Sequence, residues 1–110
     1  MILNMEEAIL LLTSDSEMQQ KQVFSALVMK LAQLTDSDDG NRVIFLPNIS
    51  RFMTLLQKHH DNDATTMKEA MIFLRYLCRN DDCSAAMRPY IEYIMAKLQL
   101  HTSTEVIFYT

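Results

Sequence analysis

Apolar residues recur along the chain at intervals of three and four positions, the spacing that places side chains on one face of an α-helix. One such stripe occurs three times: Met5, Ala8, Ile9 and Leu12; Ile49, Phe52, Met53 and Leu56; and Ile91, Ile94, Met95 and Leu98. A second stripe lies between these copies and occurs twice: Phe24, Leu27, Leu31 and Leu34, then Met67, Ala70, Leu74 and Leu77. The near-constant displacement between copies predicts a repeated set of helices whose striped faces are buried.

Polar residues and prolines separate the stripes, and these separators recur too. An acidic pair follows each copy of the second stripe, and a proline comes a little later: Asp38, Asp39 and Pro47, then Asp81, Asp82 and Pro89. Carboxylates favour a helix N-terminus, and proline stops one helix while suiting the first turn of the next. We therefore expect short helices over residues 41–46 and 84–88, each followed by a sharp turn.

Two polar links carry further helix-start signals. Ser14 and Glu17 have the spacing of a capping box, and Asp63 or Thr65 is placed to cap the helix that carries Met67. Each cap stabilises a helix by about 1 kcal/mol, so we expect caps to fix boundaries rather than to supply the stability.

The unit that emerges is a short helix, a proline-started helix, a polar link and a longer helix. A unit of about 43 residues cannot bury both of its faces alone, and stacking of units solves this problem. We predict an all-α fold in one domain over residues 1–110, with units at about 1–40, 41–82 and 83–110. One Gly and two Pro among 110 residues exclude an all-β sandwich or barrel, which needs frequent turn residues.

The sequence LPNISRFMTLL (46–56), followed after a polar link by EAMIFLRYLC (69–78), resembles helices two and three of an armadillo repeat, and residues 84–88 resemble helix one of the next. The resemblance covers essentially the whole chain: helices two and three of one repeat (3–35), a complete repeat (41–79), and helices one and two of a third (83–100). It implies a right-handed α-solenoid of about two and a half repeats, with stacked third helices lining a concave protein-binding surface. The related HEAT repeat has a similar period and is the alternative subtype.

The third repeat breaks off in the sequence. By the displacement that separates Phe24 from Met67, the counterpart of Met67 falls at Thr110, where the third long helix should begin its stripe. We therefore expect the chain to be a piece of a longer protein, or a solenoid whose open end is closed by a partner. An uncovered apolar stripe is typical of an interface, so two states remain open: a homodimer that a charge at Ile94 or Leu98 would break, and a monomer whose ends are capped internally.

Charge and cysteine content exclude several partners and compartments. The net charge is −4, and ten Lys and Arg are scattered among fourteen acidic residues without a cluster, so we expect no nucleic-acid partner and no membrane partner. No cationic signal-peptide region precedes an apolar run, and no apolar run is long enough to span a bilayer. Cys78 and Cys83 are too few to staple a secreted domain, which predicts reduced thiols in the cytoplasm or nucleus, with Cys78 on a buried stripe.

No residue pattern points to catalysis. His59 and His60 lie near Asp61 and Asp63, but adjacent side chains do not face each other on a helix, and no second ligand pair has suitable spacing. We interpret these residues as solvated parts of a polar link. The single Gly40 excludes a glycine-rich phosphate loop, and the recurring acidic clusters fit helix-capping links better than paired catalytic carboxylates. We predict a protein that is not an enzyme, with no cofactor, no metal site and no small-molecule substrate.

The candidate binding residues lie on the third helices, off the core stripe: Met29, Gln33, Lys68, Ile72, Tyr76 and Arg79. Tyr76 and Arg79 share a helical face, and Tyr and Arg are frequent interface hot spots; packing of Tyr76 between repeats is the competing interpretation. Gln33 and Tyr76 stand where the best-known armadillo proteins carry a groove-facing asparagine, so an importin-like mode is not expected. Apolar contacts beside the cations Lys68, Arg75 and Arg79 favour an amphipathic helix or an acidic, hydrophobic peptide as ligand.

The function that these patterns favour is a non-catalytic scaffold that binds a partner helix or peptide through the third-helix face, or that self-associates through the open end. Two alternatives remain. One is a regulatory helical domain of a larger enzyme or cytoskeletal factor, and the other is a six-helix adaptor of the death-domain kind that assembles homotypically. The latter fold needs no period, so the regular displacement of both stripes counts against it.

Overall fold

The computed structural model describes residues 4–100, and every regular element in that range is helical. The α-helices are α1 (Met5–Leu12), α2 (Asp15–Met18), α3 (Lys21–Thr35), α4 (Asp39–Phe45), α5 (Ile49–His59), α6 (Ala64–Leu77), α7 (Asp81–Met87) and α8 (Ile91–Leu100). Two short 3₁₀ helices connect α4 to α5 and α7 to α8, namely η1 (Leu46–Asn48) and η2 (Arg88–Tyr90). The predicted all-α class is confirmed, while the expectation about Thr110 lies outside the described residues.

The order α4–η1–α5 returns one unit later as α7–η2–α8, with equal lengths for the first two elements. Both short helices start two or three residues before the predicted positions, because polar side chains just ahead of them cap their backbone. Asp38 accepts a hydrogen bond from the Asn41 N–H at 3.1 Å, and Asn80 accepts one from the Cys83 N–H at 3.0 Å. In the second unit the cap is therefore an asparagine, and Asp81 lies in the first turn of α7.

The capping box predicted at Ser14 and Glu17 is wrong. Ser14 precedes α2, a helix of four residues, and makes no side-chain capping bond. A capping box forms instead at α1, where Asn4 Oδ1 accepts from the Glu7 N–H at 2.8 Å and Glu7 Oε1 accepts from the Asn4 N–H at 3.3 Å. Asp63 stands at the N-cap position of α6, one of the two predicted places, but its side chain makes no capping bond to the backbone and accepts from Thr66 Oγ1 instead.

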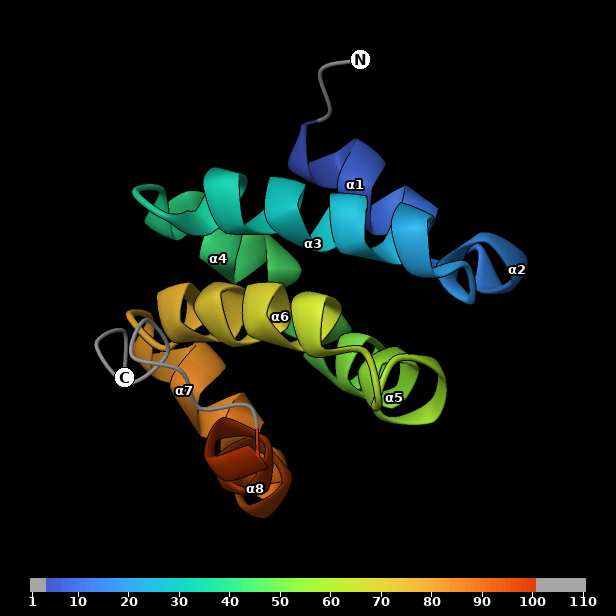
Figure 1. Cartoon of the computed structure of the whole chain (residues 1–110). Helices are drawn as coiled ribbons and strands as arrows, with labels where there is room; N and C mark the ends of the chain where they lie inside the picture. The colour runs from blue at the N-terminus through green and yellow to red at the C-terminus, as the bar shows by residue number, and fades with distance from the viewer. Residues whose placement is uncertain (1–3, 101–110) are drawn as a thin grey trace.

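The helices α3 and α6 form the centre of the molecule, where they lie side by side and run in the same direction (Figure 1). In this view α4 and α5 lie behind the pair, and α1 and α8 flank it on opposite sides. The radius of gyration of 12.8 Å is that expected for a compact domain of about 100 residues. Both long helices are thus covered by neighbours on more than one side.

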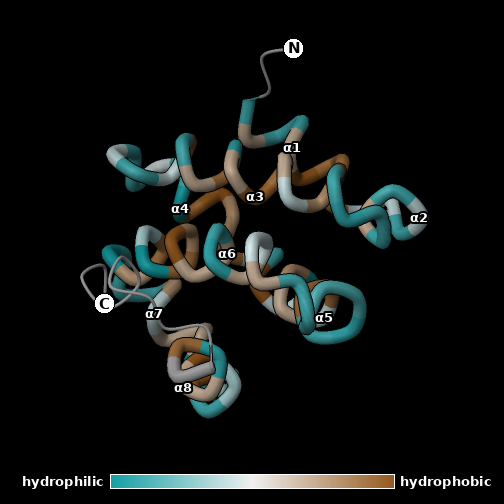
Figure 2. The backbone as a smooth tube through the Cα atoms, viewed as in Figure 1, coloured by the Kyte–Doolittle hydropathy of each residue, from teal (hydrophilic) through white to brown (hydrophobic). Residues whose placement is uncertain are grey.

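Four phenylalanines, one from each of α3, α4, α5 and α6, meet in the core and are fully buried. The Phe73 ring centroid lies 5.0 Å from that of Phe45 and 5.1 Å from that of Phe52, in edge-to-face geometry. Phe24 stacks against Phe52 at 5.6 Å. Such pairs add about 0.5–1.5 kcal/mol each to the energy of burial. Figure 2 shows that hydrophobic stretches lie between helices, while the outer turns of α2 and α5 are hydrophilic.

The interpretation of His60 as a solvated link residue is wrong, because its side chain is 2% exposed. Its ring stacks on Phe24 with the centroids 4.0 Å apart, and Nε2–H donates to the Met18 carbonyl at 2.5 Å. Burial lowers the pKa of His60, since a desolvated site disfavours the charged imidazolium. Met18 is itself fully buried, so this contact fastens α2 to the end of α5.

Replacing Phe73 by Ala removes the central ring of the aromatic cluster, and we expect the free energy of unfolding to fall by about 3–5 kcal/mol because a cavity remains. Urea denaturation followed by circular dichroism measures this change. Leu10→Ala is the control, because Leu10 is 72% exposed and exposed substitutions change stability by about 0.5 kcal/mol or less. Equal losses for the two variants would show that the cluster does not hold the core together.

The free energy of unfolding should fall as the pH drops below about 6.5, the ordinary pKa of histidine. Because the folded-state pKa of His60 is lowered, the unfolded chain binds the proton more readily, and the stabilisation is complete above that pH and lost toward the folded-state pKa. Urea midpoints of wild type and His60→Gln across this range measure the effect. The difference in free energy of unfolding between the two proteins should narrow as the pH falls. A difference that stays constant with pH would contradict the lowered pKa of His60. His59→Gln is the control and should show the same pH dependence as the wild type.

Candidate protein-binding surfaces

The six residues proposed from the sequence lie along α3, α6 and the turn after α6. Met29 is 48% exposed on α3, and Gln33 one turn later is also exposed, as expected for positions off the core stripe. The remaining four lie on α6 or just after it: half-buried Lys68, Ile72 and Tyr76, and exposed Arg79. Because α3 and α6 run side by side, equivalent positions such as Met29 and Ile72 lie on neighbouring helices. We call this set of six residues the α3–α6 face.

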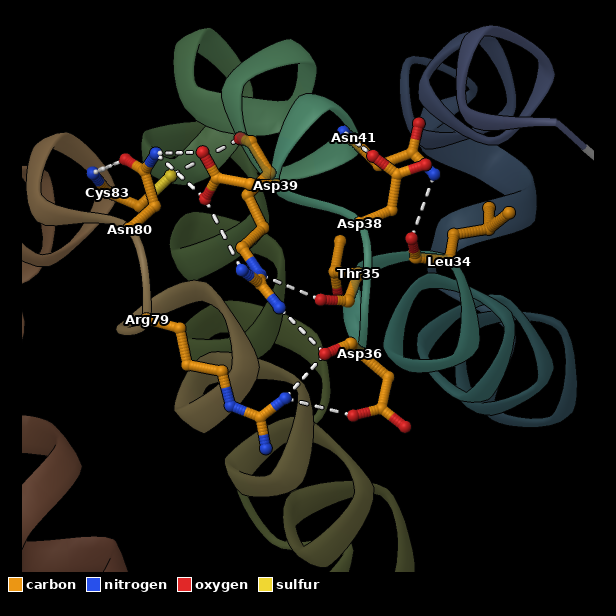
Figure 3. Close-up of polar contacts among 10 residues, drawn as sticks. Leu34, Thr35, Asp36, Asp38, Asp39, Asn41, Arg79, Asn80 and Cys83 are labelled. Carbon is orange, nitrogen blue, oxygen red and sulfur yellow. Dashed lines mark hydrogen bonds and ion pairs between the residues drawn. The ribbon is translucent and has the colours of Figure 1, made fainter.

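Tyr76 and Arg79 are in direct contact, with the guanidinium carbon 4.7 Å from the ring centroid. Arg79 also donates to the Asp36 carbonyl and, at 3.0 Å, to Asp36 Oδ1 (Figure 3). Arg42, which is 8% exposed, donates to the Thr35 carbonyl at 2.8 Å and to the Asp36 carbonyl at 2.7 Å. These bonds satisfy carbonyls at the C-terminal end of α3. Arg79 therefore has an intramolecular structural role, and its part in partner binding stays a prediction.

Other polar groups at this junction are also engaged within the chain (Figure 3). Asp39 Oδ1 accepts from Asn80 Nδ2 at 3.2 Å and from Arg42 Nη1 at 3.3 Å, and Cys83 Sγ donates to the Arg42 carbonyl at 3.3 Å. The acidic residues thus join the two units. Over residues 4–100, no three His, Cys, Asp or Glu side chains gather closely enough to hold a metal ion.

An apolar groove of about 340 Å³, which we call the terminal groove, opens between α6, α7 and α8. Its apolar lining is Met71, Leu74, Met87, Ile91, Ile94, Met95 and Leu98, and its polar lining is Arg75, Cys78, Ser84 and Arg88. Ile91 is 53% exposed and Met95 is 50% exposed, so the prediction that this copy of the stripe is buried is wrong for these two residues. The assignment of Cys78 to a buried stripe is also wrong, because its side chain is exposed. Spacing identifies an apolar face but does not say what covers it.

The same surface exists one unit earlier, where it is covered. Each lining residue of the terminal groove has a counterpart in α3, α4, η1 or α5, as Leu74 has in Leu31 and Ile94 has in Phe52. All of these counterparts are buried except Leu46, which is half-buried. The helix α6 packs over this surface and places Phe73 between Phe45 and Phe52. The terminal groove is therefore a copy of the surface that α6 fills in the preceding unit, and no helix among residues 4–100 covers it.

Polar contacts to the link between α5 and α6 hold the outer wall of the groove in place. Tyr93 Oη donates to Asp61 Oδ1 at 2.6 Å, and Lys97 Nζ lies 2.8 Å from the same oxygen. Lys97 Nζ also donates to the Asp61 carbonyl at 3.2 Å. Burial, together with the hydrogen bond to Asp61, raises the pKa of Tyr93. Because these bonds fix α8, the groove exists before a ligand arrives, which lowers the ordering cost of binding.

The sequence predicts an uncovered stripe at the open end but assigns most groove residues to the core instead of to a binding surface. Concave shape depends on the placement of α7 and α8 relative to α6, which spacing along the chain does not encode. The signal that does exist is the third copy of the first stripe over 91–98, which repeats the apolar spacing of the two earlier copies.

No known protein family, curated protein or solved structure matches the chain. In the part of the chain that the structure describes, no helix is both long enough and apolar enough to cross a membrane. The functional assignment therefore rests on the geometry of the chain itself.

Cys78 and Cys83 should differ strongly in their reaction with a maleimide, because Cys78 is exposed at the groove and Cys83 is fully buried. Burial raises the pKa of both thiols, so access to the reagent separates them. Mass spectrometry should show one label on the folded protein, at Cys78, and two after denaturation. The folded Cys78→Ser variant is the control and should take up no label. Rapid labelling of Cys83 in the folded wild type would contradict its buried position.

Proposed function

We propose that this chain is a non-catalytic protein-interaction module that binds a helix of a partner protein in the terminal groove. The observation that carries the proposal is the covered copy of the same surface one unit earlier, where every equivalent position except Leu46 is buried. An apolar groove shaped for an amphipathic helix favours such a helix as its ligand. Contiguous exposed apolar surface of this kind is typical of interaction sites.

The proposal includes a right-handed armadillo- or HEAT-like stack of about two and a half units. The return of a short helix, a 3₁₀ turn and a longer helix in the same order supports it, as does the parallel pairing of α3 and α6. A place in the cytoplasm or nucleus belongs to the same proposal and is supported by the free thiols of Cys78 and Cys83.

The α3–α6 face is a second candidate surface for a protein or peptide. One observation favours it: Met29 is 48% exposed on the same pair of helices as the Tyr76–Arg79 stack. Because Arg79 also bonds Asp36, loss of binding in Arg79→Ala would mix a structural effect with an interface effect. Tyr76→Ala is therefore the cleaner test of this face.

Other occupants of the groove define the competing functions. A regulatory domain would receive a helix from elsewhere in a larger enzyme or cytoskeletal factor, and a homodimer would receive a second copy of this chain. A death-domain-like adaptor would assemble through charged patches instead of the groove. The recurrence of α4–η1–α5 as α7–η2–α8 favours stacked units over that adaptor fold.

A synthetic peptide with the sequence of α6, residues 64–77, is a direct probe because α6 fills the equivalent surface. We expect it to bind the wild-type protein with a dissociation constant of roughly 1–100 μM, measured by fluorescence anisotropy. Met95→Glu places a charge on the groove wall and should weaken binding at least about tenfold. Leu10→Glu on α1 adds the same charge at a residue that is 72% exposed and should leave binding unchanged.

Equal affinities for the Met95→Glu and Leu10→Glu variants would exclude the groove as the binding site. Light scattering across a concentration series completes the experiment. A dimer that Met95→Glu dissociates would identify a second copy of the chain as the groove ligand.

A further inference from the structure

A second cleft, of about 520 Å³, lies between α2 and α5 and shares no residue with the terminal groove. In Figure 1 these two helices lie on the side of the molecule away from α7 and α8. The volume is within the range of about 300–1,000 Å³ that is usual for ligand sites. We call it the polar cleft, because most of its lining is hydrophilic: Asp15, Gln19, Ser50, Arg51, Thr54, Lys58 and His59, beside the apolar Pro47 and Leu55.

Arg51 is held in the wall of the polar cleft by the end of α1 and the start of α2. Its Nε donates to the Leu12 carbonyl at 2.9 Å, and its Nη2 donates to the Thr13 carbonyl at 3.0 Å and to Asp15. These bonds satisfy carbonyls at the C-terminal end of α1 and fix the guanidinium. The third nitrogen, Nη1, has no hydrogen-bond partner among residues 4–100. Arg51 can therefore donate to a ligand without giving up any of these bonds.

Lys58 is the second cation of the polar cleft, and it has no hydrogen bond or ion pair within the described part of the chain. It is exposed and lies two turns after Arg51 on the same face of α5. The corresponding junction one unit later uses its lysine differently, because Lys97 is 8% exposed and donates to the Asp61 carbonyl. Lys58 thus holds no link in place, and its ammonium group is available to a ligand.

The groups of the polar cleft that remain available to a ligand are mostly hydrogen-bond donors. Arg51 Nη1 and Lys58 Nζ can only donate, and the side chains of Gln19 and Ser50, which have no partner among residues 4–100, can donate as well. The single carboxylate among the described lining residues, that of Asp15, is bound by Arg51. The lining is therefore positive, in a chain whose net charge is −4. Such a site favours an anion with several acceptor oxygens.

The spacing of the two cations favours a phosphate group over a carboxylate. Seven positions on α5 separate Arg51 from Lys58, which corresponds to about 10 Å along the helix axis. An anion that bonds both must lie between their side chains and present oxygens in both directions. A carboxylate has two oxygens and one charge, whereas a phosphorylated side chain has three terminal oxygens and a charge of about −1.5 to −2 at pH 7. The larger charge also offsets repulsion by Asp15.

We propose that the polar cleft binds a phosphorylated serine or threonine in an extended segment of a partner protein. Arg51 and Lys58 hold the phosphate, and Gln19 and Ser50 bond the peptide beside it. A segment of chain is favoured over a free phosphate ion because the cleft is much larger than a phosphate group and open to solvent. Since the polar cleft and the terminal groove share no residue, one partner can occupy both at once.

Four probes test this site in the whole protein labelled with ¹⁵N. Three are seven-residue alanine peptides with phosphoserine, glutamate or serine at the centre, and the fourth is inorganic phosphate. Chemical shifts of the backbone amides over 50–58 and of the Gln19 side-chain amide report binding, at low ionic strength, where ion pairs are least screened. We expect a dissociation constant of roughly 0.1–5 mM for the phosphoserine peptide. The glutamate peptide and inorganic phosphate should bind at least about fivefold more weakly, and the serine peptide should cause no saturable shift.

Lys58→Glu is the informative variant, because Lys58 is exposed and unbonded among the described residues, so its replacement leaves the core intact. It should weaken binding of the phosphoserine peptide at least about tenfold. Arg88→Glu is the matched control, since it makes the same change of charge at an exposed residue of the terminal groove. It should leave the dissociation constant within about twofold of the wild-type value. The spectra of both variants show directly that they are folded.

Each contrary outcome identifies what is wrong. Equal affinities for Lys58→Glu and Arg88→Glu, or no saturable shift over 50–58 with the phosphoserine peptide, overturn the polar cleft as a binding site. If inorganic phosphate binds as tightly as the phosphoserine peptide, the ligand is a free ion and the partner segment is overturned. If the glutamate peptide binds as tightly, a carboxylate suffices and the preference for phosphate is overturned. None of these results changes the terminal groove, which Met95→Glu tests separately.

Discussion

The packing of Phe73 between Phe45 and Phe52 is the contact on which the rest of the structure depends. It seals the surface formed by α3, α4 and α5, which would otherwise expose apolar side chains to water. The helix that supplies this ring also buries Met71 and Leu74 on the side that faces α7 and α8. Covering one layer with a helix thus creates a new apolar surface that needs a cover of its own. Among the described residues, the terminal groove is the apolar surface that this packing leaves without a covering helix.

Hydrophobic spacing is a local property, and it therefore predicts the all-α class and the stretches that become α1, α3, α5, α6 and α8. Burial is not local. His60 is buried because it meets Phe24 and Met18, which lie far earlier in the chain, and no spacing rule connects these positions. The predicted start of α4 is wrong because one capping side chain, that of Asp38, sets where the helix begins.

The candidate binding surfaces also combine local features, which the sequence predicts, with tertiary features, which it does not. Met29 and Gln33 are exposed, as their positions off the stripe predict, because the direction of a side chain on a helix follows from its number. The bond between Arg79 and Asp36 joins two layers, and the sequence gives no sign of it. Met95 is readily identified as apolar, but its exposure depends on the placement of α8 against α6, which is a tertiary property. The sequence therefore identifies apolar and exposed residues that can bind a partner, but it does not predict the surface that they form together.

Different chemistry fastens the two ends of α3. Near its start, Phe24 stacks on the neutral imidazole of His60, and at its end the Thr35 and Asp36 carbonyls are held by Arg42. A guanidinium keeps its charge at every pH at which proteins fold, whereas an imidazole does not. Protonation of His60 therefore weakens the first attachment, while the charge of Arg42 in the second does not change. The attachment at the N-terminal end of α3 is therefore sensitive to acid, whereas the attachment at its C-terminal end is not.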